Sequence, residues 1–206
     1  MNCQLQVINN SNVAGSFVIY QSSDIPQSYT LAWMSKYAYP STTLTFNWNT
    51  TNDFVWSGNS QPVAGTVIQA GQAMPITPEG TQITFSYDAQ NHAFFFSNQT
   101  QSPQGGKYVI LMDSSVPPGG ALVGVGMSGA PTNLINALPN MTAVFTPQPN
   151  YWLGFSSTVQ QGEVIVTETL NPVQIVFPPN VTSMRATLNP DLTWTVAPNY
   201  MLKEEA

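Results

Sequence analysis

The stretch that decides the fold class is Thr43-Leu44-Thr45-Phe46-Asn47-Trp48-Asn49. Its apolar residues alternate one for one with polar residues. Successive side chains of a β-strand point to opposite faces, so this spacing sorts the stretch into one apolar and one polar face. A helix would scatter the same residues around its circumference. The stretch therefore predicts a strand with one face in a hydrophobic core, and the same alternation recurs at 82–87 and 192–196.

Shorter runs rich in apolar, β-branched and aromatic residues extend this pattern along the chain. They occupy 5–8, 17–20, 29–34, 54–56, 67–70, 108–112, 122–127, 142–145, 151–155, 164–169, 173–177 and 184–188. Turn residues separate them roughly every eight to twelve residues, as in sandwiches and barrels. Only 132–138 and 200–206 offer a turn of helix. The predicted fold is all-β: an antiparallel β-sandwich or flattened barrel of about twelve or more short strands, with minimal helix.

The turns predict three hairpins and no domain boundary. Asx- and Pro-containing loops join the runs on either side of 88–91, 189–191 and 49–53. The most loop-like stretch, 100–106, has the length of a loop and not of a linker. We therefore expect a single domain over 1–206, with 199–206 as a C-terminal tail.

The composition replaces charge with neutral polarity. Only ten Asp or Glu and four Lys or Arg occur among 206 residues, whereas 73 residues are Asn, Gln, Ser or Thr. Four cations and a net charge of −6 argue against nucleic acid as a partner. No apolar run reaches the ~20 residues of a transmembrane helix. The start, with neither basic residues nor an apolar run, and the single Cys3 favour a cytoplasmic protein without disulfides; release or non-classical secretion stays open.

Groups that could perform catalysis are scarce. His92 is the only histidine, and we interpret it as a strand-end residue bonded at a turn, although a Ser/His/Asp relay stays open. The acidic residues fall in turns, in the tail or on opposite faces of a strand. A calcium site from Asp53 with Asn49 and Asn52 is the weaker alternative to no metal site. The sequence predicts a protein without catalytic residues, metal or cofactor.

Two sequence motifs are candidates for ligand binding. Gly124-Val125-Gly126-Met127-Ser128-Gly129 spells the dinucleotide fingerprint, but Ala130-Pro131 follows where a helix should start, which favours a glycine-kinked strand near a neighbouring backbone. Aromatic residues beside amides and a carboxylate could bind a sugar, although such aromatics mostly fill cores. The predicted ligand-binding residues are Asn52, Asp53, Trp56, Asn150 and Trp152.

Several segments resemble the RhiA family, the rhizosphere-expressed proteins of rhizobia. They are Leu31-Ala32-Trp33-Met34-Ser35-Lys36, 42–48, 54–56, 123–129, Phe145-Thr146-Pro147-Gln148-Pro149-Asn150-Tyr151-Trp152, 186–189 and 193–196, with the opening 5–9. The resemblance implies an abundant, soluble, intracellular bacterial protein made under density-dependent control and without an established activity. It implies no functional residues.

Two functions follow as expectations. The first is a non-catalytic β-protein that associates with itself or with a partner surface, because few charges are available to guard its edge strands. The alternative is a lectin-like module that binds glycans. A toxin-like protein that engages membranes lacks a basic amphipathic segment, and a hydrolase would depend on His92 alone.

Overall fold

The computed structural model of the chain describes residues 1–23, 25–58, 61–147 and 150–199. These residues are mostly strand, with one short 3₁₀ helix, which confirms the all-β class. The strands are β1 (Asn2–Asn9), β2 (Gly15–Gln21), β3 (Tyr29–Thr30), β4 (Met34–Ala38), β5 (Thr42–Asn49), β6 (Asn52–Ser57), β7 (Gln72–Pro75), β8 (Gln82–Asp88), β9 (Ala93–Thr100), β10 (Tyr108–Met112), β11 (Leu122–Met127), β12 (Ala130–Asn136), β13 (Thr142–Phe145), β14 (Tyr151–Ser156), β15 (Val173–Ile175), β16 (Ser183–Leu188) and β17 (Trp194–Pro198), and the helix is η1 (Thr167–Thr169).

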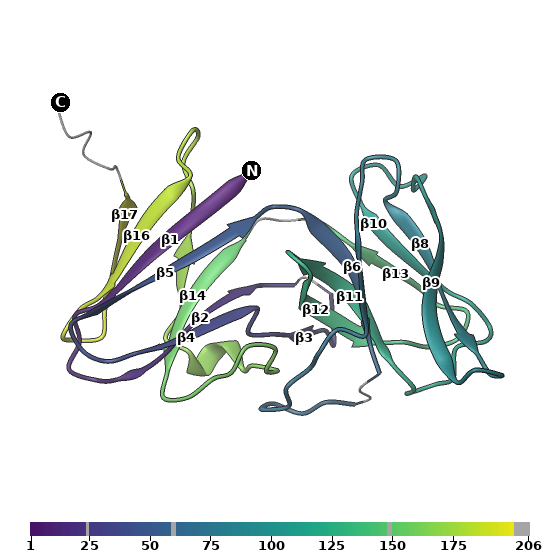
Figure 1. The fold of residues 1–206 in the computed structure, drawn as a ribbon, viewed down its shortest axis with the longest axis horizontal. Helices are drawn as coiled ribbons and strands as arrows, with labels where there is room; N and C mark the ends of the chain where they lie inside the picture. Colours follow the sequence, from purple (N-terminus) through teal and green to yellow (C-terminus); the bar gives the residue numbers. More distant parts are fainter. Residues whose placement is uncertain (24, 59–60, 148–149, 200–206) are drawn as a thin grey trace.

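The strands build two sandwiches that lie side by side along an elongated molecule (Figure 1). The terminal sandwich packs sheet β17-β16-β1-β5 on sheet β15-β14-β2-β4. The inserted sandwich packs sheet β3-β12-β11-β6-β7 on sheet β13-β10-β8-β9. Each has its own core: Leu5, Phe46 and Leu153 belong to the first, and Phe54 and Phe85 to the second.

The strand at 43–49 behaves as its alternation predicts. Phe46 and Trp48 are buried on the core side of β5, whereas Asn47 and Asn49 are exposed. Opposite them, β1 repeats the alternation, with Leu5 paired to Phe46 and fully buried. Burying each large side chain stabilises the fold by about 1.5–3 kcal/mol before the entropy cost of ordering it.

Two strand pairs depart from the predicted antiparallel arrangement. β1 runs parallel to β16, and β8 runs parallel to β10. The other pairs are antiparallel. In both exceptions a long segment separates the partners, so no tight hairpin turn dictates their direction. The sheets are therefore mixed.

The predicted hairpin at 49–53 is wrong, whereas the other two are confirmed. β8 pairs with β9 and β16 with β17 across their short loops. β5, however, pairs with β1, and β6 pairs with β11 in the other sandwich. Residues 50–51 thus carry the chain from one sandwich to the other. The loop composition indicates a turn but cannot show which strands it joins.

Two predicted strands are instead loops that cover sheet faces. Residues 67–70 contribute only an isolated bridge at Val67, and 164–169 contribute a bridge at Val164 followed by η1. Ile68 and Val164 are buried against the outer faces of β11 and β12 together with Leu134. Their apolar character therefore reflects their role as a cover and not participation in a sheet ladder.

β7 and β12 lie where no strand is predicted, and β12 replaces the helical turn considered at 132–138. The run predicted as one strand at 29–34 is divided: β3 ends at Thr30, and β4 starts at Met34 and continues to Ala38. β12 lies between β3 and β11, and residues 131–135 are buried on both faces. A strand covered on both faces does not alternate between polar and apolar residues, so its period is invisible in the sequence.

Trp33 joins the two sandwiches. It is 1% exposed, and its Nε1 donates a hydrogen bond of 2.9 Å to the carbonyl oxygen of Met127, the last residue of β11. Its ring lies 5.7 Å from that of Trp48 and 6.3 Å from that of Tyr151 in the terminal core. Of the predicted tail 199–206, Asn199 donates its backbone N–H to the Ser183 carbonyl, and 200–206 lie outside the described residues.

Candidate functional site

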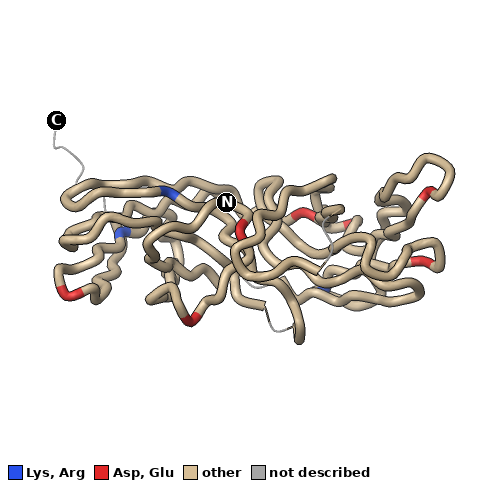
Figure 2. The backbone as a smooth tube through the Cα atoms, turned by 90° about the horizontal axis from the view of Figure 1, so that it is seen from below, with Lys and Arg blue, Asp and Glu red and all other residues tan. Residues whose placement is uncertain are grey.

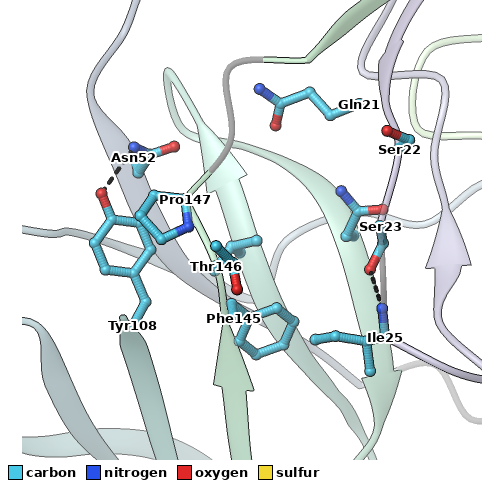
Figure 3. A pocket seen from close by; sticks show the side chains of 11 residues that line it. Gln21, Ser22, Ser23, Ile25, Asn52, Tyr108, Phe145, Thr146 and Pro147 are labelled. Atoms are coloured by element: carbon cyan, nitrogen blue, oxygen red, sulfur yellow. Dashed lines mark hydrogen bonds between the residues drawn. The ribbon is translucent and has the colours of Figure 1, made fainter. Parts of the chain in front are cut away.

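A pocket lies where the two sandwiches meet, and we call it the inter-sandwich pocket (Figure 3). Gln21 ends β2 of the terminal sandwich, and Ser22 follows it along the pocket wall. The inserted sandwich contributes Asn52 from β6, Tyr108 from β10 and Asn133 from β12. The rest of the lining is Ser23, Ile25, Val125, Phe145, Thr146 and Pro147. The cavity measures about 50 Å³.

The polar groups of this pocket are neutral and partly fixed. The Asn52 Nδ2 donates a hydrogen bond of 3.0 Å to the Tyr108 hydroxyl, and the Ser23 Oγ accepts one of 3.2 Å from the Ile25 backbone N–H (Figure 3). Gln21 and Asn133 are 6% and 4% exposed. No charged residue is among the described residues that line the cavity. The described lining of the pocket can therefore form hydrogen bonds to a ligand but no ion pairs.

Asn133 is the residue that stands out. Its Oδ1 is buried and has no hydrogen-bond partner. An acceptor left unpaired in a protein interior costs about 1–3 kcal/mol, so buried amides are normally satisfied. Asn133 lines the cavity, but its Oδ1 itself is shielded from solvent.

Of the five predicted ligand-binding residues, only Asn52 lines this pocket. Its neighbour Asp53 is 5% exposed, and its Oδ2 accepts a hydrogen bond of 2.7 Å from the Gly129 backbone N–H. Burial raises the pKa of the Asp53 carboxyl, and the Gly129 hydrogen bond opposes that rise. Asp53 therefore holds the turn between β11 and β12. It does not line the pocket beside Asn52, because successive residues of β6 point to opposite faces.

Trp56 is half-buried and packs against the inserted core. Its Nε1 donates a hydrogen bond of 3.1 Å to the Gln72 Oε1, and its ring packs 6.2 Å from Phe85 and 5.8 Å from Phe94. Gly71 lies against the same ring so closely that a side chain there would clash with it. The indole N–H and much of the ring are thus engaged within the inserted sandwich.

Trp152 lines a second, shallower groove of about 300 Å³ together with Tyr20 and Glu168. Its ring is stacked on Tyr20, with centroids 6.5 Å apart and planes 14° from parallel, and its Nε1 is buried without a partner. Burial, and then the charge of Glu168, raise the pKa of Tyr20 to about 12. Asn150 lines neither cavity. The five predicted residues therefore do not form one site.

The histidine and the acidic residues take up structural positions. His92 lies in the turn before β9 with a φ of 50°, and its Nδ1 lies 3.1 Å from the Tyr87 hydroxyl. Nearby, the carboxylate of Asp113 accepts hydrogen bonds from the hydroxyls of Ser86 and Ser115. Burial raises the pKa of Asp113, but these hydrogen bonds lower it, and the net direction is downward. Within the described ranges, no three His, Cys, Asp or Glu side chains gather as a metal would need.

The structure confirms that the glycine motif at 124–129 belongs to a kinked strand close to a neighbouring backbone. Gly124 and Gly126 belong to β11, and the register against β12 shifts between Val125 and Gly126. A Cβ at Gly124 would run into the backbone carbonyl of Asn133, and one at Gly126 into that of Ala130. The glycines let two strands approach closely beside the inter-sandwich pocket.

Sequence reasoning misses Gln21, Tyr108 and Asn133. Gln21 and Tyr108 lie at the ends of strands, and no motif distinguishes them from the other polar residues of the chain. Asn133 lies in a strand that is not predicted. Three sheets bring these residues together, so no local spacing could reveal the site.

Comparison with known proteins gives one clear relationship. The RhiA family profile matches residues 1–199. Protein RhiA of Rhizobium leguminosarum bv. viciae is 29% identical over 195 residues, which cover 92% of this chain and 84% of that protein. No solved structure matches. In the described part of the chain, no helix has the length and apolar character needed to span a bilayer. The match over nearly the whole length shows that this chain belongs to the RhiA family.

Proposed function

We propose that the protein is non-catalytic and acts by associating with copies of itself through its uncharged strand edges. The observation that carries this proposal is the composition of the eight edge strands in the described sheets, which are β17, β5, β13, β9, β3, β7, β15 and β4. Lys36 on β4 is the one charged residue among them. Figure 2 shows how sparse the charges are along the described residues.

Edge strands expose backbone N–H and C=O groups, and proteins normally guard them with charges, proline or bulges. Lys36 covers one point of the β5 edge, because its Nζ donates to the Thr45 carbonyl and lies 5.3 Å from the Phe46 ring centroid. Only β7 and β17 carry a proline, Pro75 and Pro198, each at the strand end. The β8–β9 pair has a register shift, and the Phe96 backbone N–H of β9 donates to the Gln72 Oε1. Elsewhere the edges carry mostly Thr, Ser, Asn, Gln and apolar residues.

The two longest edge strands, β5 and β9, are the best candidates for pairing between molecules. β5 exposes Thr43 and Asn47, and β9 exposes Phe95, which is 40% accessible. Amide and hydroxyl groups cost less to desolvate than ions, so such an edge can be buried against a second copy. The buried and unpaired Cys3 suits a reducing cytoplasm, where we place this association.

Light scattering of the purified protein at several concentrations tests the proposal. The wild type should exceed the monomer mass of 22.4 kDa and grow with concentration. The variants T43K and F95K put a guard on β5 and β9 and should shift the distribution toward monomer. Val63 is 71% exposed and outside any strand, so V63K adds the same charge as a control and should change nothing. A wild type that stays monomeric at high concentration, without filaments or particles in electron micrographs, would refute the proposal.

Carbohydrate binding at the Trp152 groove is the second candidate. The stack of Trp152 on Tyr20 beside the Glu168 carboxylate combines an aromatic surface with a hydrogen-bonding anion, and these are the groups that sugars bind. Glycan-array binding that W152A abolishes and W56A preserves would support it, because Trp56 belongs to the inserted sandwich and does not line this groove. Binding that survives W152A would remove this groove as the site.

A further inference from the structure

The free edge of β5 carries backbone groups that no described strand uses. β5 and β17 are the two edges of one sheet, and β1 is the only strand of the described sheets that pairs with β5 (Figure 1). The Thr50 N–H donates to the Met1 carbonyl, so these opposed residues form a hydrogen-bonded pair. Bonded and non-bonded pairs alternate along an antiparallel ladder. The N–H and C=O groups of Thr43, Thr45 and Asn47 therefore point away from β1.

Most of these outward groups have no partner among the described residues. The Thr45 carbonyl accepts a hydrogen bond of 2.6 Å from the Lys36 Nζ, but a carbonyl oxygen can accept a second one. The three N–H groups and the other two carbonyls form no hydrogen bond within the described chain. Asn49 is the next residue with outward groups, and its carbonyl already accepts from the Ser128 Oγ. The open groups are thus centred on Thr45.

We propose that two copies of the protein pair antiparallel through β5, about a two-fold axis that passes Thr45. Thr45 then lies opposite Thr45 of the second copy, and Thr43 of each molecule lies opposite Asn47 of the other. These pairs use all the open groups, because the members of each pair exchange hydrogen bonds in both directions. The pairing rests on the proposed self-association and adds to it the strand, the direction and the register.

The side chains along this edge suit a second copy of the same edge. Opposed residues of an antiparallel pair share one face of the sheet. The exposed Thr43 would meet the exposed Asn47, and the two Thr45 side chains would meet each other. On the core side, the partly buried Leu44 would meet Phe46 of the second copy. Polar side chains therefore face polar ones, and apolar side chains face apolar ones.

The other long edge and the opposite edge of the same sheet are less open. In β9, the Phe96 N–H already donates to the Gln72 Oε1 of β7. In β17, the same alternation turns the backbone groups of Trp194, Val196 and Pro198 outward, and proline has no N–H to donate. A two-fold dimer through β5 therefore closes on itself and leaves β17 at both outer edges.

Lys36 weakens this pairing without blocking it. Its Nζ lies on the Thr45 carbonyl, so the two Lys36 ammonium groups of a dimer come close to each other at the axis and repel. Higher ionic strength screens this repulsion and should strengthen the association. K36M keeps an unbranched side chain without the charge, and it should lower the dissociation constant of the dimer about tenfold.

Amide hydrogen exchange of the full-length protein, followed by NMR at low and at high protein concentration, tests the pairing residue by residue. The N–H groups of Thr43, Thr45 and Asn47 should exchange freely in the dilute protein and at least about tenfold more slowly in the concentrated protein. The N–H groups of Leu44 and Phe46 bond to β1 and should be protected at both concentrations.

Two proline variants test the same edge by sedimentation equilibrium. N47P removes an outward N–H of β5 and no hydrogen bond to β1, so it should raise the dissociation constant at least about tenfold. V196P removes an outward N–H of β17 and should leave the constant unchanged. Circular dichroism establishes that each variant is folded. The exchange pattern of the wild type decides the question if a proline variant does not fold.

The outcomes separate this pairing from the proposed function. Association of a wild type whose Thr43, Thr45 and Asn47 amides exchange at a rate independent of concentration would overturn the pairing, whereas self-association through another edge would stand. Association that V196P weakens and N47P leaves intact would overturn it as well. A wild type that stays monomeric at high concentration would refute the proposed function and the pairing together.

Discussion

The two sandwiches differ in how the chain builds them. The inserted sandwich consists of β6 to β13, one continuous segment, with the short β3 as its only addition from elsewhere in the described chain. The terminal sandwich needs both ends of the chain, because β1 pairs with β16, which lies near the other end of the sequence. The difference indicates that the terminal sandwich carries the larger entropy cost of closure and depends more on its core.

The cores differ as well. Rings in the terminal core include the indoles of Trp33 and Trp48, which pack edge to face 5.7 Å apart. The inserted core is built around phenylalanines, with Phe85 and Phe96 5.5 Å apart. Trp33 belongs to the terminal core yet hydrogen-bonds to β11 of the other sandwich. Trp33 therefore couples the two sandwiches, together with Met127, whose side chain is buried in the terminal core.

The largest effect should come from W33A. Truncating a fully buried tryptophan costs about 3–5 kcal/mol, and the lost hydrogen bond to Met127 adds about 1 kcal/mol. Calorimetry should show that the unfolding transition of the variant splits, with the terminal sandwich melting first. W33F, which keeps a ring but not the N–H, should lose less stability. A single cooperative transition in W33A would mean that other contacts couple the sandwiches.

Matched truncations of one phenylalanine in each core should have the next largest effect. Phe46 is 1% exposed and Phe85 is fully buried, so F46A and F85A should each cost about 3–5 kcal/mol. Native-state hydrogen exchange should separate them when each is combined with W33A, which is expected to let the two sandwiches unfold separately. F85A should lower protection in β8 and β10 while β1 and β16 keep theirs, and F46A should do the reverse. Equal loss of protection in both sandwiches would contradict the assignment of two cores.

The fold class could be predicted from sequence because the strands with one solvated face, such as β5, alternate strictly. β12 could not, because both of its faces are covered and its residues do not alternate. The pairing partner of each strand could not be predicted either. The loop at 50–51 resembles a hairpin turn, yet it connects two sandwiches. Alternation reports the environment of each face, and it does not report which strand lies alongside.

The site was harder to predict than the fold. Asn52 was identified because it stands beside aromatics, but the same criterion selected Trp56, whose indole packs on Phe85 and Phe94 and does not line the pocket. Asn133 resembles the other seventeen asparagines until its unpaired oxygen is seen. Hydrogen-bond satisfaction is a property of the packed structure, so it leaves no trace in the local sequence.

A smaller effect should follow from G124A. The added methyl group would meet the Asn133 carbonyl across β11 and β12, so the two strands must separate slightly, at a cost of about 1–3 kcal/mol. G129A gives a contrasting control, since nothing lies near its Cβ and only its φ of 79° opposes the change. Chemical denaturation compares the two. An unchanged midpoint for G124A would show that this junction is looser than the contacts indicate.

The smallest effect concerns two aspartates of the inserted sandwich whose pKa values move in opposite directions. The pKa of Asp113 is lowered, so its carboxylate contributes stability above the ordinary pKa, and this contribution is lost as pH falls through the lowered value. The pKa of Asp53 is raised, so the folded state favours the protonated form, and stability declines as pH rises from the ordinary pKa through the raised value. D113N should therefore destabilise the protein at neutral pH, by about 1 kcal/mol for a partly solvated group. D53N, which can keep the acceptor for Gly129, should stabilise it. Urea unfolding between about pH 3 and pH 7 measures both, and wild-type-minus-variant differences of the same sign for the two variants would contradict the opposite environments assigned to these carboxyls.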